Sequence, residues 1–307
     1  MNTYNFIDEL WLDVLNDVMG DGSVEGSRNG QTREILGWTG RLADPRACFL
    51  FNPIRKLSPS YAAGEMLWYL AADDAMPRIT GYAPSYSRFA EADGRAYGAY
   101  GPRVMIHLPD IVSQLVSNPT TRQAVIPIFQ PRDVLAARLG DRKDIPCTSS
   151  LMFIVRDGKL NMITTMRSND AWLGLPYDIF CWCHLQMLIA QMTGHQLGWY
   201  QHQVMSMHLY EKHWDRSAEA VNATAGFDAA PLEYSESRPS WHHILEAVKI
   251  EEWNREKKCC TDHTEGIGTD SSLLVQLVCM AATKFWPYAS KRITNPTLRK
   301  FIEKEQP

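Results

Sequence analysis

The strongest constraint on the fold is a strand hairpin followed at once by a long apolar helix. Residues 149–168 read SSLMFIVRDGKLNMITTMRS, in which Asp157-Gly158 separates two apolar runs. An Asp-Gly pair in that setting predicts a tight turn between antiparallel strands. Residues 177–194, YDIFCWCHLQMLIAQMTG, stay apolar for several turns and end at Gly194, which predicts a helix buried on most sides. The combination indicates an α+β chain in which helices cover a sheet.

Other segments extend this pattern. Apolar residues spaced three and four apart predict a helix near residues 7–18, and we expect further helices at 60–74 and 107–118. A short strand is predicted within 122–131, and residues 199–210 look extended.

Two segments carry many turn residues. We interpret residues 20–31 as a glycine-rich loop and residues 77–101 as irregular surface. From about Pro231 onward the chain is predicted to be helical, with a polar interruption around residues 259–272. No repeat or convincing linker divides the sequence, so we expect one domain over residues 1–307.

Composition limits the class of function. The formal net charge of −4 argues against a general binder of nucleic acid or membrane surfaces, so an anionic ligand would need a local cluster of arginines. The N-terminal segment is acidic and amphipathic, unlike a signal peptide, and no run of about 18 uncharged apolar residues occurs. We therefore expect a cytoplasmic protein.

The seven cysteines have neither disulfide-framework nor zinc-site spacing, which favours free thiols and no metal. Cys147 follows Pro146 and precedes a strand. A lone cysteine is usually a small buried hydrophobe, but a nearby arginine would lower its pKa and favour the nucleophilic thiolate. Arg167, on the return strand of the hairpin, is the candidate for that arginine.

Five residues, Arg167 among them, could bind or transfer a group. Arg167 and Ser168 offer hydrogen-bond donors to a phosphate. His208 and Tyr210 share a strand face and could bind a sugar hydroxyl, although ordinary polar strand residues look the same. Glu65 lies in an apolar helix, where burial would raise its pKa and suit proton transfer, unless it faces solvent.

These features occur together in one order. Residues 144–194, with the Pro-Cys pair, the Asp-Gly hairpin, Arg-Ser-x-Asp and Leu-Gly-x-Pro, are followed by MHLYEKH at 207–213. This arrangement resembles the catalytic half of the thymidylate synthase superfamily. The likeness is clearest at 120–215 and weaker upstream, in EMLWYL, AYGPR and RNG, while residues 216–307 diverge.

The resemblance implies a fold, a reaction and roles. The fold would be thymidylate synthase-like, with a mixed sheet, one face of which forms the interface of an obligate homodimer. Cys147 would add to C6 of a pyrimidine nucleotide and Glu65 would manage protons through water. The residues implied in binding the 5′-phosphate are Arg28, Arg167, Ser168 and, from the partner subunit, Arg122. Gln123 stands where the family has a second arginine, so phosphate binding should be somewhat weaker or differently arranged.

The remaining implied roles concern the sugar, the cosubstrate and the base. His208 and Tyr210 would bind the 3′-hydroxyl, and Asp170 would meet the pterin of 5,10-methylenetetrahydrofolate. Gly174 would let the base approach closely, and Tyr100 would be a further member of the site.

Asp178 is the most informative departure from thymidylate synthases. Their uracil reader is the Asn of a Pro-Phe-Asn motif, whereas this chain has Pro-Tyr-Asp. An ionised carboxylate accepts but cannot donate to O4 of uracil, whereas cytosine presents an N4 amino donor. Asp178 therefore favours cytosine, with one shared proton on N3 or on the carboxyl group. Cytidylate hydroxymethylases of the superfamily carry this substitution.

Two weaker departures agree. The C-terminal TLRKFIEKEQP is charged, unlike the apolar tail that keeps water from the methylene intermediate of thymidylate synthases, and Thr148 replaces the usual histidine. A less sealed site is consistent with water as the final acceptor.

We therefore expect a 5-hydroxymethylase of a cytidine monophosphate that uses methylenetetrahydrofolate. Ser168 favours dCMP, and a CMP-specific enzyme stays open. The alternatives are a C5-methyltransferase acting on dUMP or dCMP, and a catalytically silent nucleotide-binding or RNA-binding relative.

Overall fold

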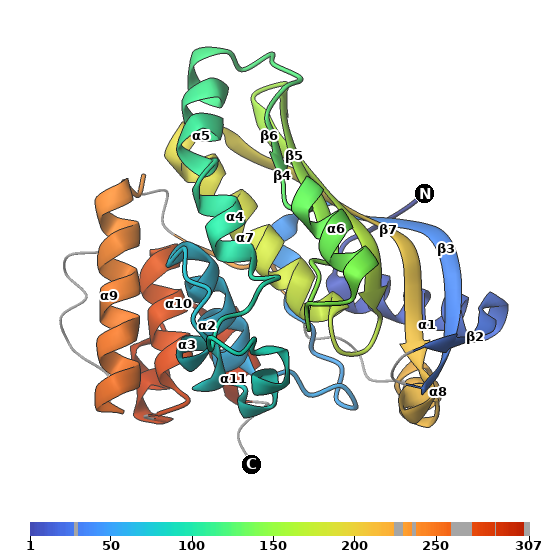
Figure 1. The fold of residues 1–307 in the computed structure, drawn as a ribbon. Coiled ribbons are helices and arrows are strands. Elements are labelled where there is room, and N and C mark those ends of the chain that lie inside the picture. The colour runs from blue at the N-terminus through green and yellow to red at the C-terminus, as the bar shows by residue number, and fades with distance from the viewer. Residues whose placement is uncertain (28–29, 224–229, 235–237, 259–271, 286, 304–307) are drawn as a thin grey trace.

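A mixed seven-stranded sheet forms one side of the molecule (Figure 1). The computed structural model describes residues 1–27, 30–223, 230–234, 238–258, 272–285 and 287–303. The strand order is β1-β3-β7-β6-β5-β4, with β2 paired to β3. The strands are β1 (Asn2–Tyr4), β2 (Ser23–Ser27), β3 (Gly30–Leu42), β4 (Val125–Pro127), β5 (Thr148–Arg156), β6 (Lys159–Asp170) and β7 (Gln196–Tyr210).

The predicted hairpin is confirmed. β5 and β6 are antiparallel from the Arg156–Lys159 pair onward. Asp157 (φ 51°) and Gly158 (φ 71°) both lie in the left-handed region, as a two-residue turn of the type that fits twisted strands requires. β7 runs parallel to β6 and places Asp170 beside His208, so the ends of the two strands bring their side chains together.

Helices cover the sheet, and α7 lies between the strands and a helical layer that contains α2, α9 and α10 (Figure 1). The α-helices are α1 (Ile7–Asp21), α2 (Pro59–Leu70), α3 (Met76–Thr80), α4 (Tyr100–Met105), α5 (Leu108–Ser117), α6 (Pro131–Leu139), α7 (Leu175–Thr193), α8 (Trp214–Asn222), α9 (Trp241–Lys257), α10 (Leu273–Ala282) and α11 (Pro296–Glu303). The 3-10 helices are η1 (Pro45–Ala47), η2 (Pro84–Phe89), η3 (Glu211–His213) and η5 (Pro287–Arg292).

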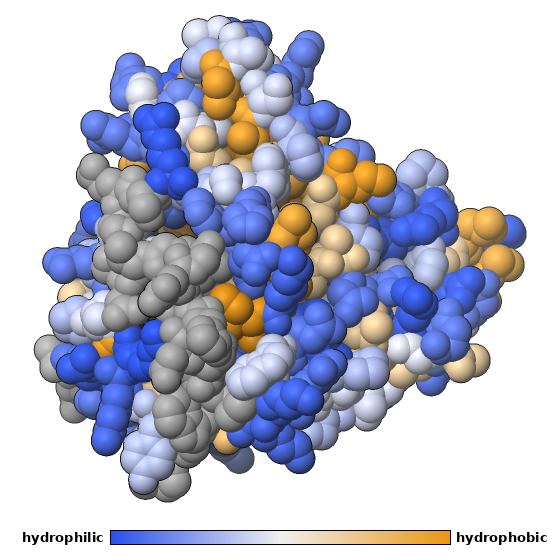
Figure 2. All heavy atoms as spheres, turned by 90° about the vertical axis from the view of Figure 1, so that its left-hand side faces the viewer, coloured by the Kyte–Doolittle hydropathy of each residue, from blue (hydrophilic) through white to orange (hydrophobic). Residues whose placement is uncertain are grey.

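α7 is buried on most sides, as predicted, and ends at Gly194 in the left-handed conformation (φ 74°). None of the helices in the described ranges is long and apolar enough to cross a bilayer. Seen from the side of α9, the surface is largely hydrophilic, with separate hydrophobic patches (Figure 2). This is what helices that bury one face present to water.

Two expectations about loops were wrong. Much of residues 20–31 belongs to β2 and to the start of β3, which pair as a hairpin, because glycine in a strand pattern does not exclude a strand. Residues 77–101 contain α3, η2 and the start of α4, and the side chains of Arg78, Ile79 and Tyr82 are buried. Prolines at the first turns of these short helices start them rather than break them.

Candidate active site

Cys147 sits immediately before β5, at the point where the return strand β6 passes it. The Arg167 guanidinium lies 3.7 Å from the Cys147 Sγ through Nη2. The same guanidinium donates to the carbonyl oxygens of Ile145 and Pro146, at 2.9 Å each. Arg167 also donates its backbone N–H to the Cys147 carbonyl at 2.9 Å. The predicted contact between the thiol and an arginine therefore exists, and three bonds to the 145–147 segment hold the arginine there.

The surroundings of the thiol nevertheless disfavour the thiolate. Burial raises the pKa of Cys147 to about 11, and although Arg167 lowers it, the carboxylates of Asp144 and Asp178 raise it. Arg167 therefore lowers the thiol pKa as expected, but burial and the two carboxylates outweigh its effect. Removing the negative charge of Asp178 would bring the Cys147 pKa down, which couples the thiol to the state of that carboxyl group.

Asp178 lies in the first turn of α7 and is part-buried. Its Oδ2 accepts a hydrogen bond from Asn169 Nδ2 at 2.8 Å. Burial raises the pKa of Asp178 to about 7, because the lowering effect of the Asn169 bond does not offset desolvation and the nearby charge of Asp170. Asp178 thus titrates near neutrality.

Gly174, the residue before α7, leaves room for the hydrogen bond between Asn169 and Asp178. A Cβ at position 174 would lie 3.0 Å from Asn169 Nδ2 and 3.3 Å from Asp178 Oδ2, so any larger residue would press on the bond between them. This places Gly174 directly against Asp178.

Glu65 faces the interior from α2 and is 7% exposed, so the surface alternative is wrong. Its Oε1 accepts from the Tyr61 hydroxyl at 2.9 Å, and its Oε2 lies 3.9 Å from the Cys181 Sγ. Burial, followed by the charge of Asp178, raises the pKa of Glu65 to about 8. The site therefore holds two electrostatically coupled carboxyl groups that both titrate near neutral pH.

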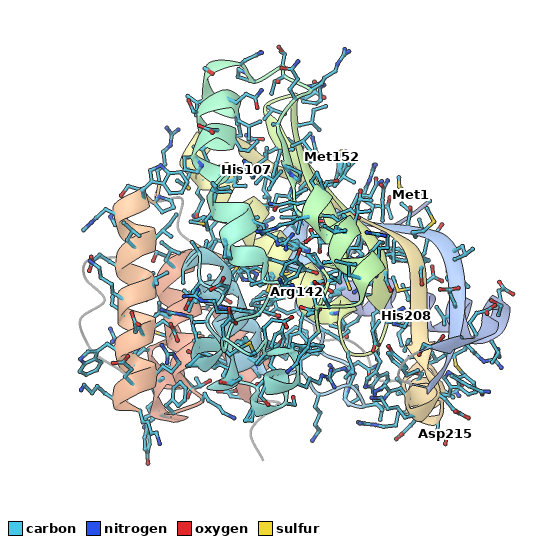
Figure 3. The ribbon with its side chains drawn as sticks, in the orientation of Figure 1. Met1, His107, Arg142, Met152, His208 and Asp215 are labelled. Carbon is cyan, nitrogen blue, oxygen red and sulfur yellow. The ribbon has the colours of Figure 1, made fainter. Side chains whose placement is uncertain are left out.

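Ser168, His208 and Tyr210 meet at the ends of β6 and β7. Ser168 Oγ lies 3.4 Å from His208 Nδ1, and the rings of His208 and Tyr210 meet edge to face with centroids 5.3 Å apart. His208 lies toward the end of the sheet from which the chain continues to Asp215 (Figure 3). A hydroxyl, an imidazole and a phenol thus lie next to the Arg167 strand segment.

Asp170 and Tyr100 complete the group that the structure brings together. Asp170 Oδ1 accepts from the backbone N–H of Trp172 (2.8 Å) and Leu173 (2.9 Å), so Oδ2 takes no part in those two bonds. Tyr100 accepts from the Thr148 N–H at 3.1 Å. Thr148 itself is fully buried, and its Oγ1 has no hydrogen-bond partner among the residues that the structure describes.

Two predicted residues are not among those that the structure places in this group. Arg122 is exposed in the segment between α5 and β4. Arg28 lies outside the described residues, and so do Cys259 and Cys260. The five other cysteines are free thiols, and within the described ranges no cluster of histidine, cysteine and carboxylate side chains could hold a metal ion.

Asn169 is the residue that sequence reasoning missed. It is 4% exposed and joins Asp178 to His202, whose Nε2 lies 3.1 Å from Asn169 Oδ1. The available signal was its position between Ser168 and Asp170, in a strand whose alternate residues face the covered side of the sheet.

A buried thiol beside an arginine, two carboxyl groups that titrate near neutrality, and a neighbouring set of hydroxyl and imidazole groups define a covalent group-transfer site for a polar ligand. The family model described as thymidylate synthase matches residues 9–259, so the chain belongs to the thymidylate synthase family. Enzymes of this family transfer a one-carbon unit from methylenetetrahydrofolate to C5 of a pyrimidine nucleotide. That class of reaction is the activity of this chain.

Proposed function

We propose that this enzyme hydroxymethylates a cytidine monophosphate, with dCMP as the favoured substrate. The one-carbon unit of 5,10-methylenetetrahydrofolate would be transferred to C5, and water would complete it to a hydroxymethyl group. Asp178 carries the proposal: it is a carboxyl group with a pKa of about 7 at the family's base-reading position.

A carboxyl group that titrates near neutrality matches cytosine well. It can accept from the N4 amino group and share one proton with N3. With the shared proton on N3, Asp178 is a carboxylate and the base carries the positive charge, so the pair as a whole has no net charge. The Asp178 charge that raises the Cys147 pKa would then be offset, so binding of cytosine would itself favour the thiolate.

The residues of this chain would divide the work as follows. Cys147 adds to C6 of the base, which concentrates electron density at C5. Protonation at N3 through Asp178 draws electrons from C6 and assists that addition. Glu65, with a pKa of about 8, exchanges protons with the base through water.

The nucleotide's phosphate and sugar would meet the ends of β6 and β7. Arg167 and Ser168 hold the 5′-phosphate together with Arg28, and His208 and Tyr210 bind the 3′-hydroxyl. The placement of Ser168, His208 and Tyr210 at two adjacent strand ends supports this assignment. Tyr100 would help to position the segment that contains Cys147, through its bond to Thr148.

Methylenetetrahydrofolate supplies the one-carbon unit when bound. Asp170 fits the polar edge of a pterin, because a carboxylate accepts from N–H donors and Oδ2 takes no part in the two backbone bonds of this side chain. Water as the final acceptor is supported by the charged sequence TLRKFIEKEQP, which differs from the apolar tail of thymidylate synthases.

We also propose a homodimer of single-domain subunits, with Arg122 reaching the phosphate of the partner subunit's site. The face of the sheet opposite α7 supports this. Along β5 buried residues alternate with part-exposed ones, and this open face carries apolar side chains, namely Met152, Ile154, Ile163 and Met205. The exposure of Arg122 also suits a role across an interface.

Product mass decides the reaction. The purified protein is incubated with methylenetetrahydrofolate and, separately, dCMP, CMP, dUMP and UMP. We expect a hydroxymethyl gain on a cytidylate, greater for dCMP than for CMP. A methyl gain on dUMP with the cytidylates unchanged would sink the proposal, and a methyl gain on dCMP would support the methyltransferase alternative.

The folate product gives a second readout, since methyl formation oxidises the cosubstrate to dihydrofolate and hydroxymethyl formation does not. Ultraviolet absorbance should therefore show no dihydrofolate. Cys147→Ser serves as the control, because it should abolish turnover while nucleotide binding is retained. If the unmutated protein binds nucleotide without turnover, it is the silent relative instead.

Asp178→Asn tests the base reader. An amide can donate to O4 and accept from N3–H, so we expect preference to shift from cytidylate towards uridylate by at least about tenfold, the cost of a mismatched hydrogen bond to a charged group. The measurement is the ratio of kcat/KM for dCMP and dUMP. An unchanged ratio would refute the role of Asp178.

A further inference from the structure

A chain of buried polar side chains ends at Asp178. The Tyr200 hydroxyl lies 2.7 Å from His202 Nδ1, His202 Nε2 lies 3.1 Å from Asn169 Oδ1, and Asn169 Nδ2 donates to Asp178 Oδ2 at 2.8 Å. Tyr200 and His202 are fully buried and Asn169 is 4% exposed. Asp178 is the one member of these four that is only part-buried, so the chain reaches the ligand side through it.

The polarity of this chain is fixed by the chemistry of its members. Burial lowers the pKa of His202 to about 3 and raises the pKa of Tyr200 well above its usual value, so both are neutral. A neutral imidazole has one donor and one acceptor nitrogen. With Tyr200 donating to Nδ1, the ring proton is on Nε2 and is donated to Asn169 Oδ1. The amide NH2 then faces Asp178, and Oδ2 can only accept.

A neutral Asp178 carries a proton on one of its two oxygens. The position of that proton determines whether the side chain can pair with cytosine or with uracil. Cytosine needs a donor opposite N3 and an acceptor opposite N4, whereas uracil needs an acceptor opposite N3 and a donor opposite O4. A carboxyl group that is free to protonate on either oxygen offers both patterns. A carboxyl group with one oxygen fixed as an acceptor offers one.

We propose that Asn169 is a positioning residue for base selection: backed by His202 and Tyr200, it holds Asp178 Oδ2 as an acceptor and so fixes the protonation pattern that matches cytosine. The inference rests on the proposed cytidylate function and adds a second requirement to it. A carboxyl group at position 178 is then not sufficient to exclude uracil. The bond from Asn169 must also determine which of its oxygens is the acceptor.

The surroundings of Asp178 give Asn169 this influence. The titratable groups that act on Asp178 or respond to its charge are Asp170 of β6, Glu65 of α2, Cys147 before β5, Cys181 of α7, Tyr100 of α4 and Tyr200 of β7, together with tyrosines of α2 and η2. None of these is a cation. The Asn169 bond is the only lowering influence on the Asp178 pKa that stands against burial and Asp170 among the described residues.

The test compares Asn169→Ala and Tyr200→Phe with the unmutated enzyme. For Asn169→Ala we expect the dCMP-to-dUMP ratio of kcat/KM to fall about tenfold, the size of one hydrogen bond to a charged group. Tyr200→Phe keeps the ring and removes only the hydroxyl, so the ratio should fall in the same direction by less. Because Tyr200 is the far end of the chain, this variant also remains informative if Asn169→Ala does not fold.

Gln186→Leu is the matched control. Gln186 is fully buried and donates to the carbonyl oxygens of Leu160 (2.9 Å) and Trp199 (3.0 Å), away from Asp178. This variant should lose thermal stability without a change in base preference. If Asn169→Ala and Tyr200→Phe also lose stability while the dCMP-to-dUMP ratio stays at the unmutated value, the inference is overturned.

A titration of Asp178 in the free enzyme separates this inference from the proposed function. The 13C shift of its carboxyl carbon, assigned by comparison with Asp178→Asn, should report a higher pKa in Asn169→Ala, since the bond that stabilises the charged form is gone. No rise overturns the inference even if the enzyme hydroxymethylates cytidylate. An enzyme that acts on uridylates alone overturns the proposed function, and the titration still decides whether Asn169 holds Asp178.

Discussion

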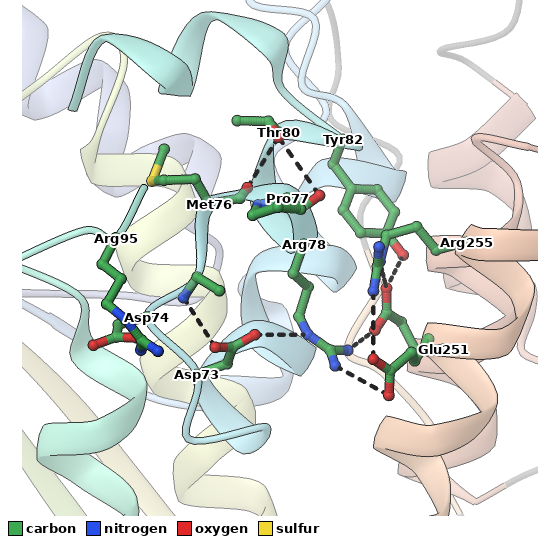
Figure 4. A network of polar contacts seen from close by, with 12 residues as sticks. Asp73, Asp74, Met76, Pro77, Arg78, Thr80, Tyr82, Arg95, Glu251 and Arg255 are labelled. Carbon is green, nitrogen blue, oxygen red and sulfur yellow. Dashed lines mark hydrogen bonds and ion pairs between the residues drawn. The ribbon is translucent and has the colours of Figure 1, made fainter. Parts of the chain in front are cut away.

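Glu251 and Glu65 are both glutamates on helices and both almost fully excluded from water, at 0% and 7% exposed, but their surroundings differ in charge. Glu251 on α9 accepts from Arg78 of α3, from Arg255 Nε at 3.1 Å and from the Tyr82 hydroxyl at 2.8 Å (Figure 4). Glu65 accepts from the Tyr61 hydroxyl, and no arginine or lysine in the described residues forms an ion pair with it.

Two buried aspartates repeat the contrast. Asp133 is 0% exposed and accepts hydrogen bonds from both terminal nitrogens of Arg103, at 2.5 and 3.0 Å. Burial raises the pKa of Asp133, but the bonds from Arg103 and the Gln130 backbone outweigh it and leave the pKa lowered. Asp178 has only the Asn169 amide and keeps a raised pKa. Arginines pair with Glu251 and Asp133, which join elements of the fold, whereas no ion pair among the described residues involves Glu65 or Asp178, the two that we place in the chemistry.

The substitution Glu65→Gln gives the strongest test of this difference between structural and reactive carboxyl groups. Glutamine has nearly the same shape and cannot transfer a proton, so we expect kcat to fall by about 10²–10⁴-fold, the range for loss of a general acid–base group. The pH profile of kcat/KM, which reports groups of the free enzyme, should also lose the limb near 8 that the Glu65 pKa predicts. A variant with near-normal turnover and an unchanged limb would show that Glu65 only packs.

The same substitution at Glu251 should have the opposite result. Glu251→Gln removes the charge that Arg78 and Arg255 share, and breaking a buried pair from one side costs about 3–5 kcal/mol. Asp73 (3.5 Å) and Glu252 (3.6 Å) still contact Arg78 and reduce the loss. We therefore expect the free energy of unfolding, measured with urea, to fall by about 3 kcal/mol.

Activity serves as the control for that variant. The folded fraction of Glu251→Gln should keep the kcat and pH profile of the unmutated enzyme, because Glu251 lies on the α3–α9 contact and not beside Cys147. If Glu251→Gln loses turnover without losing stability, the division between structural and reactive carboxylates is wrong.

The sequence predicted the parts of this site that local patterns determine. The Asp157-Gly158 turn fixes the register of β5 and β6, and that register brings Arg167 to Cys147 across twenty residues. The apolar run after Asp178 predicted α7, and the two-residue spacing of His208 and Tyr210 predicted a shared face. In each case the spacing along the chain decides the contact.

Contacts between distant segments could not be predicted in this way. The bond from Arg78 to Glu251 joins residues 173 apart, and the link from Asn169 to His202 depends on β6 and β7 lying side by side. The direction of the net shift in the Cys147 pKa could not be predicted either. It depends on how deeply the thiol is buried and on Asp144 and Asp178 as well as on Arg167. Arg28 and Arg122 stay predictions.

The last prediction concerns how stability depends on pH. The folded state holds the proton of Glu65 up to a pKa of about 8, whereas an unfolded glutamate releases it near the ordinary value of 4.5. Between these values the folded state binds more protons, so the contribution of Glu65 to the free energy of unfolding is fully present below about pH 4.5 and is lost as pH rises through 8. Asp133, with its lowered pKa, contributes in the opposite sense: its stabilisation is present above about pH 3.8 and is lost as pH falls further.

Comparing Glu65→Gln with the unmutated protein cancels the contributions of other groups, including the histidines. We expect the variant to gain stability relative to the unmutated protein as pH rises from 5 to 8, by up to about 3 kcal/mol, because the amide has no charge to bury. Glu251→Gln should show no such gain, since the charge it removes is paired with arginine in the folded state. Urea unfolding of the three proteins at pH 5, 6.5 and 8 measures both differences, and parallel curves for the unmutated protein and Glu65→Gln would mean that Glu65 ionises in the folded state as easily as in water.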